Sequence, residues 1–166
     1  MLEFESLDEV WFVVSPQNPF KKAADLLDAE TRIEMVKLAT EQHERYRAED
    51  IELTLPKPSY TINTLAALGS KYPQHSFSLI MGGDNILRFE QWKSAEEIMT
   101  NHQILVYPRP GYQISDKLPV NCRLTHAPVI EMASSDIRQW IKEGKETPFL
   151  IPEKVFDYIK KNGLYI

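Results

Sequence analysis

Short apolar runs alternate along the chain with longer stretches in which apolar residues follow helical spacing. The apolar runs end at proline or glycine, which is typical of buried strands. The predicted strands cover residues 10–14, 50–55, 77–81, 104–107 and 128–131. Helical spacing and helix start and stop signals predict helices over residues 28–45, 60–72, 94–101, 136–142 and 152–162.

Strands that alternate with helices predict an α/β fold, in which a parallel sheet is covered by helices on both faces. The 166 residues are enough for one domain with a sizeable core, so we expect residues 1–166 to form a single domain. In sheets of this kind ligands bind beyond the carboxyl ends of the strands. The loops that follow the strands are therefore the first places to search for a binding site.

Three such loops lie at residues 15–22, 82–85 and 108–112. Lys21 and Lys22 suit a phosphate group, and Arg109 suits a second one. Asp84 can accept hydrogen bonds from ribose hydroxyls, while Gly82 lets a ligand approach the backbone. Each has a purely structural alternative: the lysines are solvated, Asp84 caps the next helix, and Arg109 lies in a proline turn.

The segment 132–138 places two hydroxyls and a guanidinium at the start of a predicted helix. Backbone N–H groups at a helix N-terminus favour anions, and Arg138 adds a fork that can bind phosphate. Together with Ser134 and Ser135 this arrangement suits a triphosphate. In the alternative interpretation, Ser134 or Ser135 caps a surface helix and Arg138 is solvated.

Composition and charge narrow the classes of function. The chain is 43% hydrophobic and 26% charged, as in ordinary globular proteins, and its net charge is −5. We therefore expect no general attraction to nucleic acid or to an anionic membrane. No apolar run approaches the roughly 18 residues of a transmembrane helix, and the acidic N-terminus does not resemble a signal peptide. The single cysteine, Cys122, favours a reducing compartment, so we expect a cytoplasmic protein.

Four stretches together resemble the bacterial nicotinate-nucleotide adenylyltransferases, a family of the Rossmann-like nucleotidyltransferases. They are 15–22 (SPQNPFKK), 58–65 (PSYTINTL), 81–85 (MGGDN) with Trp92, and 132–138 (MASSDIR). The turn 109–112 (RPGY) and the ending 162–165 (NGLY) are also similar, and order and spacing are kept over nearly the whole chain. Each motif is weak alone, and the specificity of the resemblance comes from the set.

The resemblance implies adenylyl transfer from ATP to the phosphate of nicotinate mononucleotide, with deamido-NAD and pyrophosphate as products. Mg²⁺ is expected to accompany ATP, held largely by phosphates and water, so we name no protein ligand for a metal. Two alternatives stay open. One is a related adenylyltransferase acting on nicotinamide mononucleotide or phosphopantetheine, and the other is a nucleotide-binding module without catalysis.

The resemblance also assigns roles to particular residues. Thr61 and Trp92 correspond to positions that shape the nicotinate pocket, although Trp92 can simply pack and Thr61 can cap a helix. By the same correspondence Asp84, with Gly82, holds a ribose. The ATP phosphates are contacted by Ser134, Ser135 and Arg138, with the loop of Lys21 and Lys22 beside them. Arg109, in the similar turn 109–112, is a further substrate-binding candidate.

One departure from the family pattern is large. Family members begin with a strand, a glycine-rich turn and a catalytic His-x-Gly-His motif, none of which occurs in these 166 residues. The four histidines are scattered, at His43, His75, His102 and His126, and we expect none of them to be catalytic. We therefore expect a sheet that lacks its first strand, and impaired catalysis by this chain. An open strand edge invites pairing, so a homo-oligomer is also among the expectations.

Overall fold

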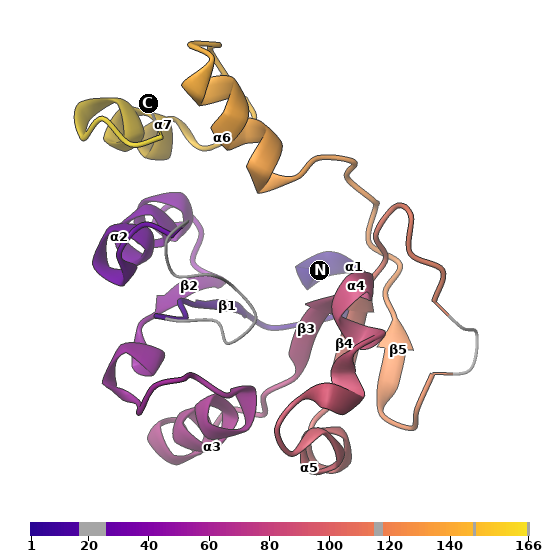
Figure 1. The fold of residues 1–166 in the computed structure, drawn as a ribbon. Helices are drawn as coiled ribbons and strands as arrows, with labels where there is room; N and C mark the ends of the chain where they lie inside the picture. The colour runs from indigo at the N-terminus through magenta and orange to yellow at the C-terminus, as the bar shows by residue number, and fades with distance from the viewer. Residues whose placement is uncertain (17–25, 115–117, 148, 166) are drawn as a thin grey trace.

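The computed structural model describes residues 1–16, 26–114, 118–147 and 149–165 (Figure 1). Its strands are β1 (Val10–Val13), β2 (Tyr46–Glu49), β3 (Leu79–Gly82), β4 (Ile104–Tyr107) and β5 (Cys122–Leu124). Its α-helices are α1 (Leu2–Glu5), α2 (Ala29–Thr40), α3 (Thr61–Lys71), α4 (Gly83–Ile86), α5 (Ala95–Asn101), α6 (Ser134–Lys142) and α7 (Glu153–Lys161). Two 3₁₀ turns, η2 (Ile51–Thr54) and η3 (Phe89–Gln91), complete the described elements.

All strand pairs in the described residues are parallel, and they form two separate sheets. One sheet has the order β1-β2 and the other the order β3-β4-β5. Helices α1 and α2 lie on one side of the strands, and α3 and α5 lie on the other (Figure 1). The predicted α/β fold with a parallel arrangement and helices on both faces is therefore confirmed.

The strand predicted over residues 50–55 is wrong. The strand β2 ends at Glu49, and the chain then forms the 3₁₀ turn η2. The apolar pattern misses β2 because the most buried side chain of this strand, that of Glu49, is charged. Glu49 is compensated by Lys71 Nζ at 3.1 Å and by the Tyr72 hydroxyl at 2.9 Å, both from the end of α3 or just beyond it.

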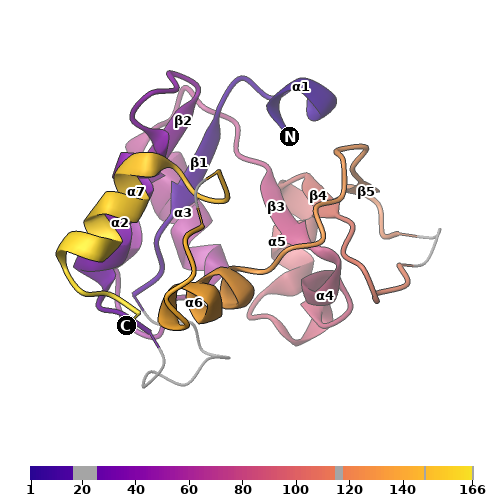
Figure 2. The same ribbon diagram turned by 90° about the horizontal axis from the view of Figure 1, so that it is seen from above.

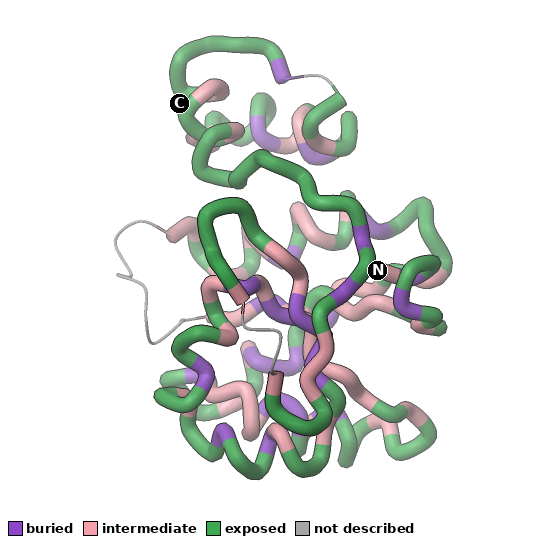
Figure 3. The backbone as a smooth tube through the Cα atoms, turned by 90° about the vertical axis from the view of Figure 1, so that its right-hand side faces the viewer, coloured by how far each residue is buried: buried purple, intermediate pink, exposed green. Residues whose placement is uncertain are grey.

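The strand predicted over residues 128–131 is also wrong, because the last described strand, β5, comes earlier in the chain. Val129 and Ile130 are exposed, so their apolar character does not reflect burial in a sheet. The Tyr107 hydroxyl holds this segment: it donates to the Pro128 carbonyl at 2.6 Å and accepts from the Ile130 N–H at 3.0 Å. Figure 3 shows the exposed path from here into α6.

Helix boundaries follow local hydrogen bonding. Helix α2 begins after Asp28, whose carboxylate accepts from the Thr31 N–H at 2.8 Å and the Thr31 hydroxyl at 2.6 Å. The helix ends at Thr40, earlier than the predicted residue 45, because the chain then turns into β2. Helix α3 has Tyr60 as its N-cap residue and no side-chain cap hydrogen bond, so the predicted cap at Thr61 is wrong.

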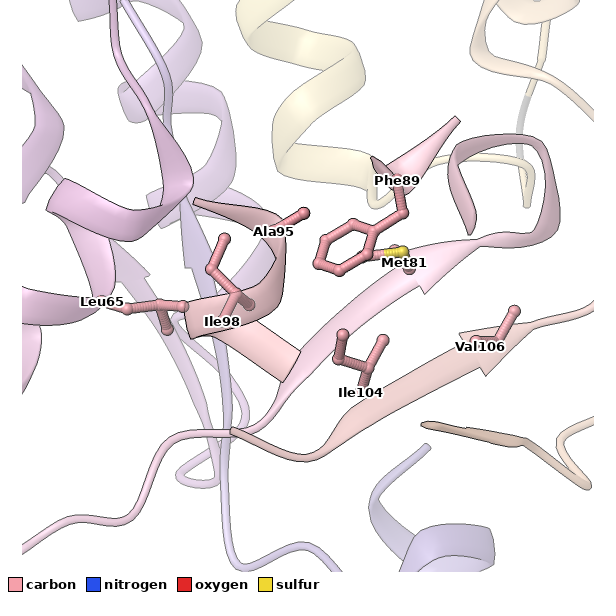
Figure 4. Packing of buried hydrophobic residues seen from close by; sticks show 7 residues of the cluster. All are labelled: Leu65, Met81, Phe89, Ala95, Ile98, Ile104 and Val106. Atoms are coloured by element: carbon pink, nitrogen blue, oxygen red, sulfur yellow. The ribbon is translucent and has the colours of Figure 1, made fainter. Parts of the chain in front are cut away.

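The main core lies between the three-stranded sheet and helices α3 and α5 (Figure 4). Its buried members are Leu65, Met81, Phe89, Ala95, Ile98, Ile104 and Val106. In β4 the side chains of Ile104, Leu105 and Val106 are all fully buried. Full burial of an aliphatic side chain stabilises a fold by roughly 1.5–3 kcal/mol, so β4 anchors this half of the molecule.

A buried ion pair ties the N-terminal helix to the last described strand. The Glu5 side chain, at the end of α1, pairs with the Arg123 guanidinium of β5 and accepts a hydrogen bond from the His126 N–H at 2.8 Å. Burial alone would raise the pKa of Glu5. The His126 hydrogen bond and the Arg123 charge outweigh it and hold the pKa below its usual value.

Candidate functional site

Three of the predicted residues meet at the carboxyl ends of β3 and β4. Gly82 ends β3, Asp84 lies in the first turn of α4, and Arg109 follows β4. Arg109 Nε lies 3.3 Å from Asp84 Oδ1, which makes an ion pair between the two loops. A Cβ atom at Gly82 would lie 2.5 Å from Asp84 Oδ1 and 2.8 Å from Arg109 Nε, so a larger residue there would displace these two side chains.

Asp84 keeps hydrogen-bonding capacity for a ligand. Gly82 is the N-cap of α4 and this helix has no side-chain cap hydrogen bond, so the interpretation of Asp84 as a cap is wrong. Its buried Oδ1 accepts no hydrogen bond from any group in the described part of the chain. The Arg109 side chain is half exposed and keeps most of its donors available. The pair therefore offers an acceptor beside an exposed cation.

Thr61 and Trp92 belong to neighbouring parts of the molecule. Thr61 begins α3, and Trp92 ends the 3₁₀ turn before α5. The Lys93 ammonium lies 4.5 Å from the centre of the Tyr60 ring, which brings the residues next to Thr61 and Trp92 together. Trp92 is partly buried and packs on Phe89, with ring centres 5.3 Å apart. Packing therefore explains part of its role.

The N-terminus of α6 differs from the predicted cap. Ser134 and Ser135 lie inside the first turn and Ala133 is the N-cap residue, so the interpretation of either serine as the cap is wrong. Asp136 accepts a hydrogen bond from the Ala133 N–H at 3.0 Å. Both serines are exposed, and none of the α6 residues is buried. Figure 2 shows α6 on the same side of the molecule as α4, beyond the strand ends.

Arg138 is exposed on α6, and its guanidinium carbon lies 5.9 Å from the centre of the Tyr165 ring. No described contact joins it to Asp84 or Arg109, so the structure does not bring all predicted residues into one cluster. Lys21 and Lys22 lie outside the described residues.

The four histidines occupy separate places and make structural contacts. The His43 ring stacks on Tyr46, the His75 ring contacts Trp11, His102 Nδ1 lies 3.0 Å from the Phe77 carbonyl, and the His126 backbone bonds to Glu5. None of these contacts involves Asp84 or Arg109.

Neither a metal site nor a membrane-spanning helix occurs among the described residues. Within residues 1–16, 26–114, 118–147 and 149–165, no three histidine, cysteine or acidic side chains gather as a cation site. The buried Asp84 oxygen faces a guanidinium, which disfavours a cation there. The described residues therefore do not fit a metal cage of their own. None of the described helices has the length and apolar character needed to cross a membrane.

Sequence reasoning missed two polar groups that the structure shows. Tyr107 is the last residue of β4, and its hydroxyl holds the segment that leads to α6. Its position at a strand end is a signal that sequence analysis can use. Glu52 is buried, and its Oε1 accepts from the Thr64 hydroxyl at 2.7 Å. Its Oε2 is buried without a partner among the described residues, and nothing in the sequence pattern marks it.

The comparisons with known proteins first define a class. Residues 3–140 match the family model described as cytidylyltransferase-like. The fold is similar to Plasmodium falciparum nicotinic acid mononucleotide adenylyltransferase complexed with NaAD, with a TM-score of 0.70, 18% identity, and coverage of 96% of this chain and 83% of that one. The same enzyme complexed with APC gives a TM-score of 0.67 at 18% identity, covering 96% and 83%. The chain therefore has a nucleotidyltransferase fold.

Relatives found by sequence define the family more narrowly than the fold does. A "Probable nicotinate-nucleotide adenylyltransferase" of Bacteroides thetaiotaomicron is 44% identical over 162 residues, which are 97% of this chain and 80% of the relative. One of the same name from Flavobacterium johnsoniae is 48% identical over 173 residues, covering 99% and 87%. The chain belongs to the nicotinate-nucleotide adenylyltransferase family.

Proposed function

We propose that this protein transfers the adenylyl group of ATP to nicotinate mononucleotide, giving deamido-NAD and pyrophosphate. The observation that carries the proposal is the meeting of Gly82, Asp84 and Arg109 at the carboxyl ends of β3 and β4, in a chain that belongs to this family. An α/β sheet binds nucleotides at this edge. Names of relatives at 44% and 48% identity favour nicotinate over the alternative acceptors.

The reaction needs positioning and fixed positive charge. A phosphate oxygen of the acceptor attacks the α-phosphorus of ATP, the new P–O bond forms, and the bond to pyrophosphate breaks in line. Negative charge collects on the transferring and leaving oxygens, and cationic side chains stabilise it. Arg109 and Arg138 are the described candidates, and Lys21 and Lys22 are candidates outside the described residues. Mg²⁺ would be held by the ATP phosphates and water rather than by protein ligands, and it would neutralise part of the phosphate charge.

Other residues are assigned to recognition. Asp84 accepts a hydrogen bond from a ribose hydroxyl, with Gly82 leaving the room for it, because its buried oxygen makes an ion pair with Arg109 but accepts no hydrogen bond in the described structure. Thr61 and Trp92 line the pocket for the nicotinate ring. Ser134 and Ser135 donate hydrogen bonds to the ATP phosphates. Residues 1–166 act as one domain, and the protein is cytoplasmic.

We expect this chain of 166 residues to keep nucleotide binding but to catalyse slowly. The 166 residues contain no His-x-Gly-His sequence, and the rings of His43, His75 and His102 contact Tyr46, Trp11 and the Phe77 carbonyl. We therefore expect the chain to bind MgATP and nicotinate mononucleotide saturably while releasing pyrophosphate slowly.

The test is a matched pair of chains assayed for nucleotide binding and for pyrophosphate release. One is the chain of 166 residues, and the other has a family strand and His-x-Gly-His segment joined before Met1. The extended chain is expected to turn over nicotinate mononucleotide faster than nicotinamide mononucleotide or phosphopantetheine. A folded extended chain that binds nucleotides without turnover would make this protein a nucleotide-binding module. Preference for another acceptor would reassign the substrate.

A further inference from the structure

Tyr107 stands at the end of a firmly anchored strand. It is the last residue of β4, the middle strand of its sheet, and the side chains of the three residues before it are fully buried. In the register of β3 and β4 it pairs with Gly82, and Arg109 follows two residues later. The backbone of Tyr107 is therefore fixed beside the loops that we propose to bind the nucleotide.

The hydroxyl of Tyr107 holds a segment that lies more than 20 residues further along the chain. It donates its proton to the Pro128 carbonyl at 2.6 Å and accepts from the Ile130 N–H at 3.0 Å. A hydroxyl carries a single proton, so Tyr107 has none left to donate to a bound nucleotide. This geometry belongs to a side chain that holds other parts of the protein.

The segment 128–133, which leads into α6, has no buried residue. All of its residues are exposed (Figure 3), and the last buried side chain before it is that of Ala127. In the described part of the chain, the two bonds to Tyr107 are the only hydrogen bonds that join residues 128–132 to another element. Helix α6 itself has no buried residue. The position of this segment against the sheet therefore depends on the Tyr107 hydroxyl.

The two hydrogen bonds shorten the tether that carries α6. Ile130 lies four residues before Ser134, the first residue of α6, whereas Ala127 lies seven residues before it. At ~3.5 Å per extended residue, the start of the helix can move within about 14 Å of Ile130, but within about 25 Å of Ala127. The local concentration of a tethered group falls as its tether lengthens. With both bonds in place, the start of α6 therefore spends a larger share of its time in one position.

That position matters because of what α6 carries. Ser134, Ser135 and Arg138 are the proposed contacts to the ATP phosphates, and Figure 2 shows α6 on the same side of the molecule as α4. Hydroxyl and guanidinium groups bind a phosphate only from a defined place and direction. A helix that is already held in that place loses less freedom when the ligand binds, which raises affinity.

We propose that Tyr107 is a positioning residue for ATP, because through Pro128 and Ile130 it holds α6 where its side chains meet the phosphates. The inference rests on the proposed function, since it takes α6 as the helix that contacts ATP. Tyr107 acts through this helix and not by touching a substrate. Its effect therefore falls on MgATP and spares nicotinate mononucleotide, whose ring is assigned to Thr61 and Trp92.

The variant Tyr107→Phe tests the proposal in the chain of 166 residues, since it keeps the ring and removes both hydrogen bonds. Calorimetric titration should show an affinity for MgATP that is lower by roughly three- to tenfold, the range that two such bonds can supply. The affinity for nicotinate mononucleotide should not change. Tyr46→Phe is the matched control, because Tyr46 is exposed at the amino end of β2, and it should leave both affinities unchanged.

Two further readouts separate positioning from a purely structural role. In Tyr107→Phe the Ile130 amide should exchange its hydrogen faster, because the acceptor of that N–H is gone. In an Arg138→Ala background, Tyr107→Phe should reduce MgATP affinity by a smaller factor, because one of the groups that Tyr107 positions is absent.

Several results would overturn the proposal. One is a faster Ile130 amide with unchanged MgATP affinity, which would limit Tyr107 to ordering its own segment. Others are an unchanged Ile130 amide, an equal loss of affinity for both nucleotides, or the same factor with and without Arg138. Absence of MgATP binding by the parent chain is a different result, since it would contradict the proposed function and this inference with it.

Discussion

Arg138 is an exposed member of the proposed nucleotide contacts, on a helix without buried residues, and its guanidinium carbon lies 5.9 Å from the centre of the Tyr165 ring. Its guanidinium is free to bind phosphate in a bidentate manner. Arg138→Ala is expected to weaken ATP binding by about 1.5–3 kcal/mol, which is roughly 10–150-fold. Calorimetric titration of MgATP measures it, with Lys142→Ala on the same helix as the control. Equal ATP affinities of the two variants would mean that Arg138 does not contact ATP.

Asp84 gives the second prediction at this scale. The variant Asp84→Asn keeps the shape of the side chain but loses the charge that faces Arg109 at 3.3 Å. Partly exposed ion pairs contribute only about 0–1 kcal/mol, so the melting temperature should change by a few degrees at most. Nucleotide affinity is expected to fall roughly tenfold, because a ribose hydroxyl loses a charged acceptor.

Asp157→Asn, on the exposed side of α7, is the matched control for both measurements. A large drop in melting temperature with unchanged nucleotide affinity would mean that Asp84 serves the fold alone.

The sequence allowed some of these residues to be found and not others. Gly82, Asp84 and Arg109 follow strands directly, and the rule that ligands bind at the carboxyl ends of strands locates them. Glu52 lies in a 3₁₀ turn after β2. Its burial depends on its packing near α3, where it bonds to Thr64, and no local pattern reports a contact between distant segments.

At the scale of elements, the ion pair between α1 and β5 predicts a dependence on pH. The fold lowers the pKa of Glu5, so its contribution to stability is complete above the unfolded value of about 4.3 and is lost as the pH falls through the lower folded value. Arg123→Gln removes the charged partner of a buried carboxylate. It is expected to reduce the free energy of unfolding at pH 7 by roughly 1–3 kcal/mol.

Urea denaturation at a series of pH values measures this contribution. The difference between the chain and its Arg123→Gln variant should shrink as the pH falls below about 4, since a protonated Glu5 needs no cation. A difference that stays constant down to acid pH would show that Arg123 acts through packing and not through charge.

The predicted elements differ in how well the sequence defines them. The strand β4 was predicted at its observed residues, because a fully buried strand reads as a continuous apolar run. The strand β2 was missed because its buried residue is Glu49, whose partners Lys71 and Tyr72 come from more than 20 residues away. The run 128–131 shows the opposite case: it was predicted as a strand because it is apolar, although Val129 and Ile130 are exposed.

At the scale of the molecule, the separation of the two sheets predicts a pattern of amide hydrogen exchange. Amides of β4 lie between two strands and beneath fully buried side chains, so they should exchange most slowly. On β1 the Trp11 and Val13 amides, which face away from β2, should exchange faster than the Phe12 amide, which faces β2. Exchange followed by nuclear magnetic resonance measures each amide. Equal protection of Trp11 and Phe12 would contradict an open edge.

Helix α3 connects the two sheets. Its Leu65 packs in the core with residues of β3 and β4, and its Thr64 hydroxyl donates to Glu52, in the 3₁₀ turn that follows β2. The same helix begins with Thr61, which we propose to contact the nicotinate ring. A nucleotide that contacts both Thr61 and Asp84 therefore binds most tightly at one relative position of the two sheets, and by thermodynamic linkage its binding makes that position more populated.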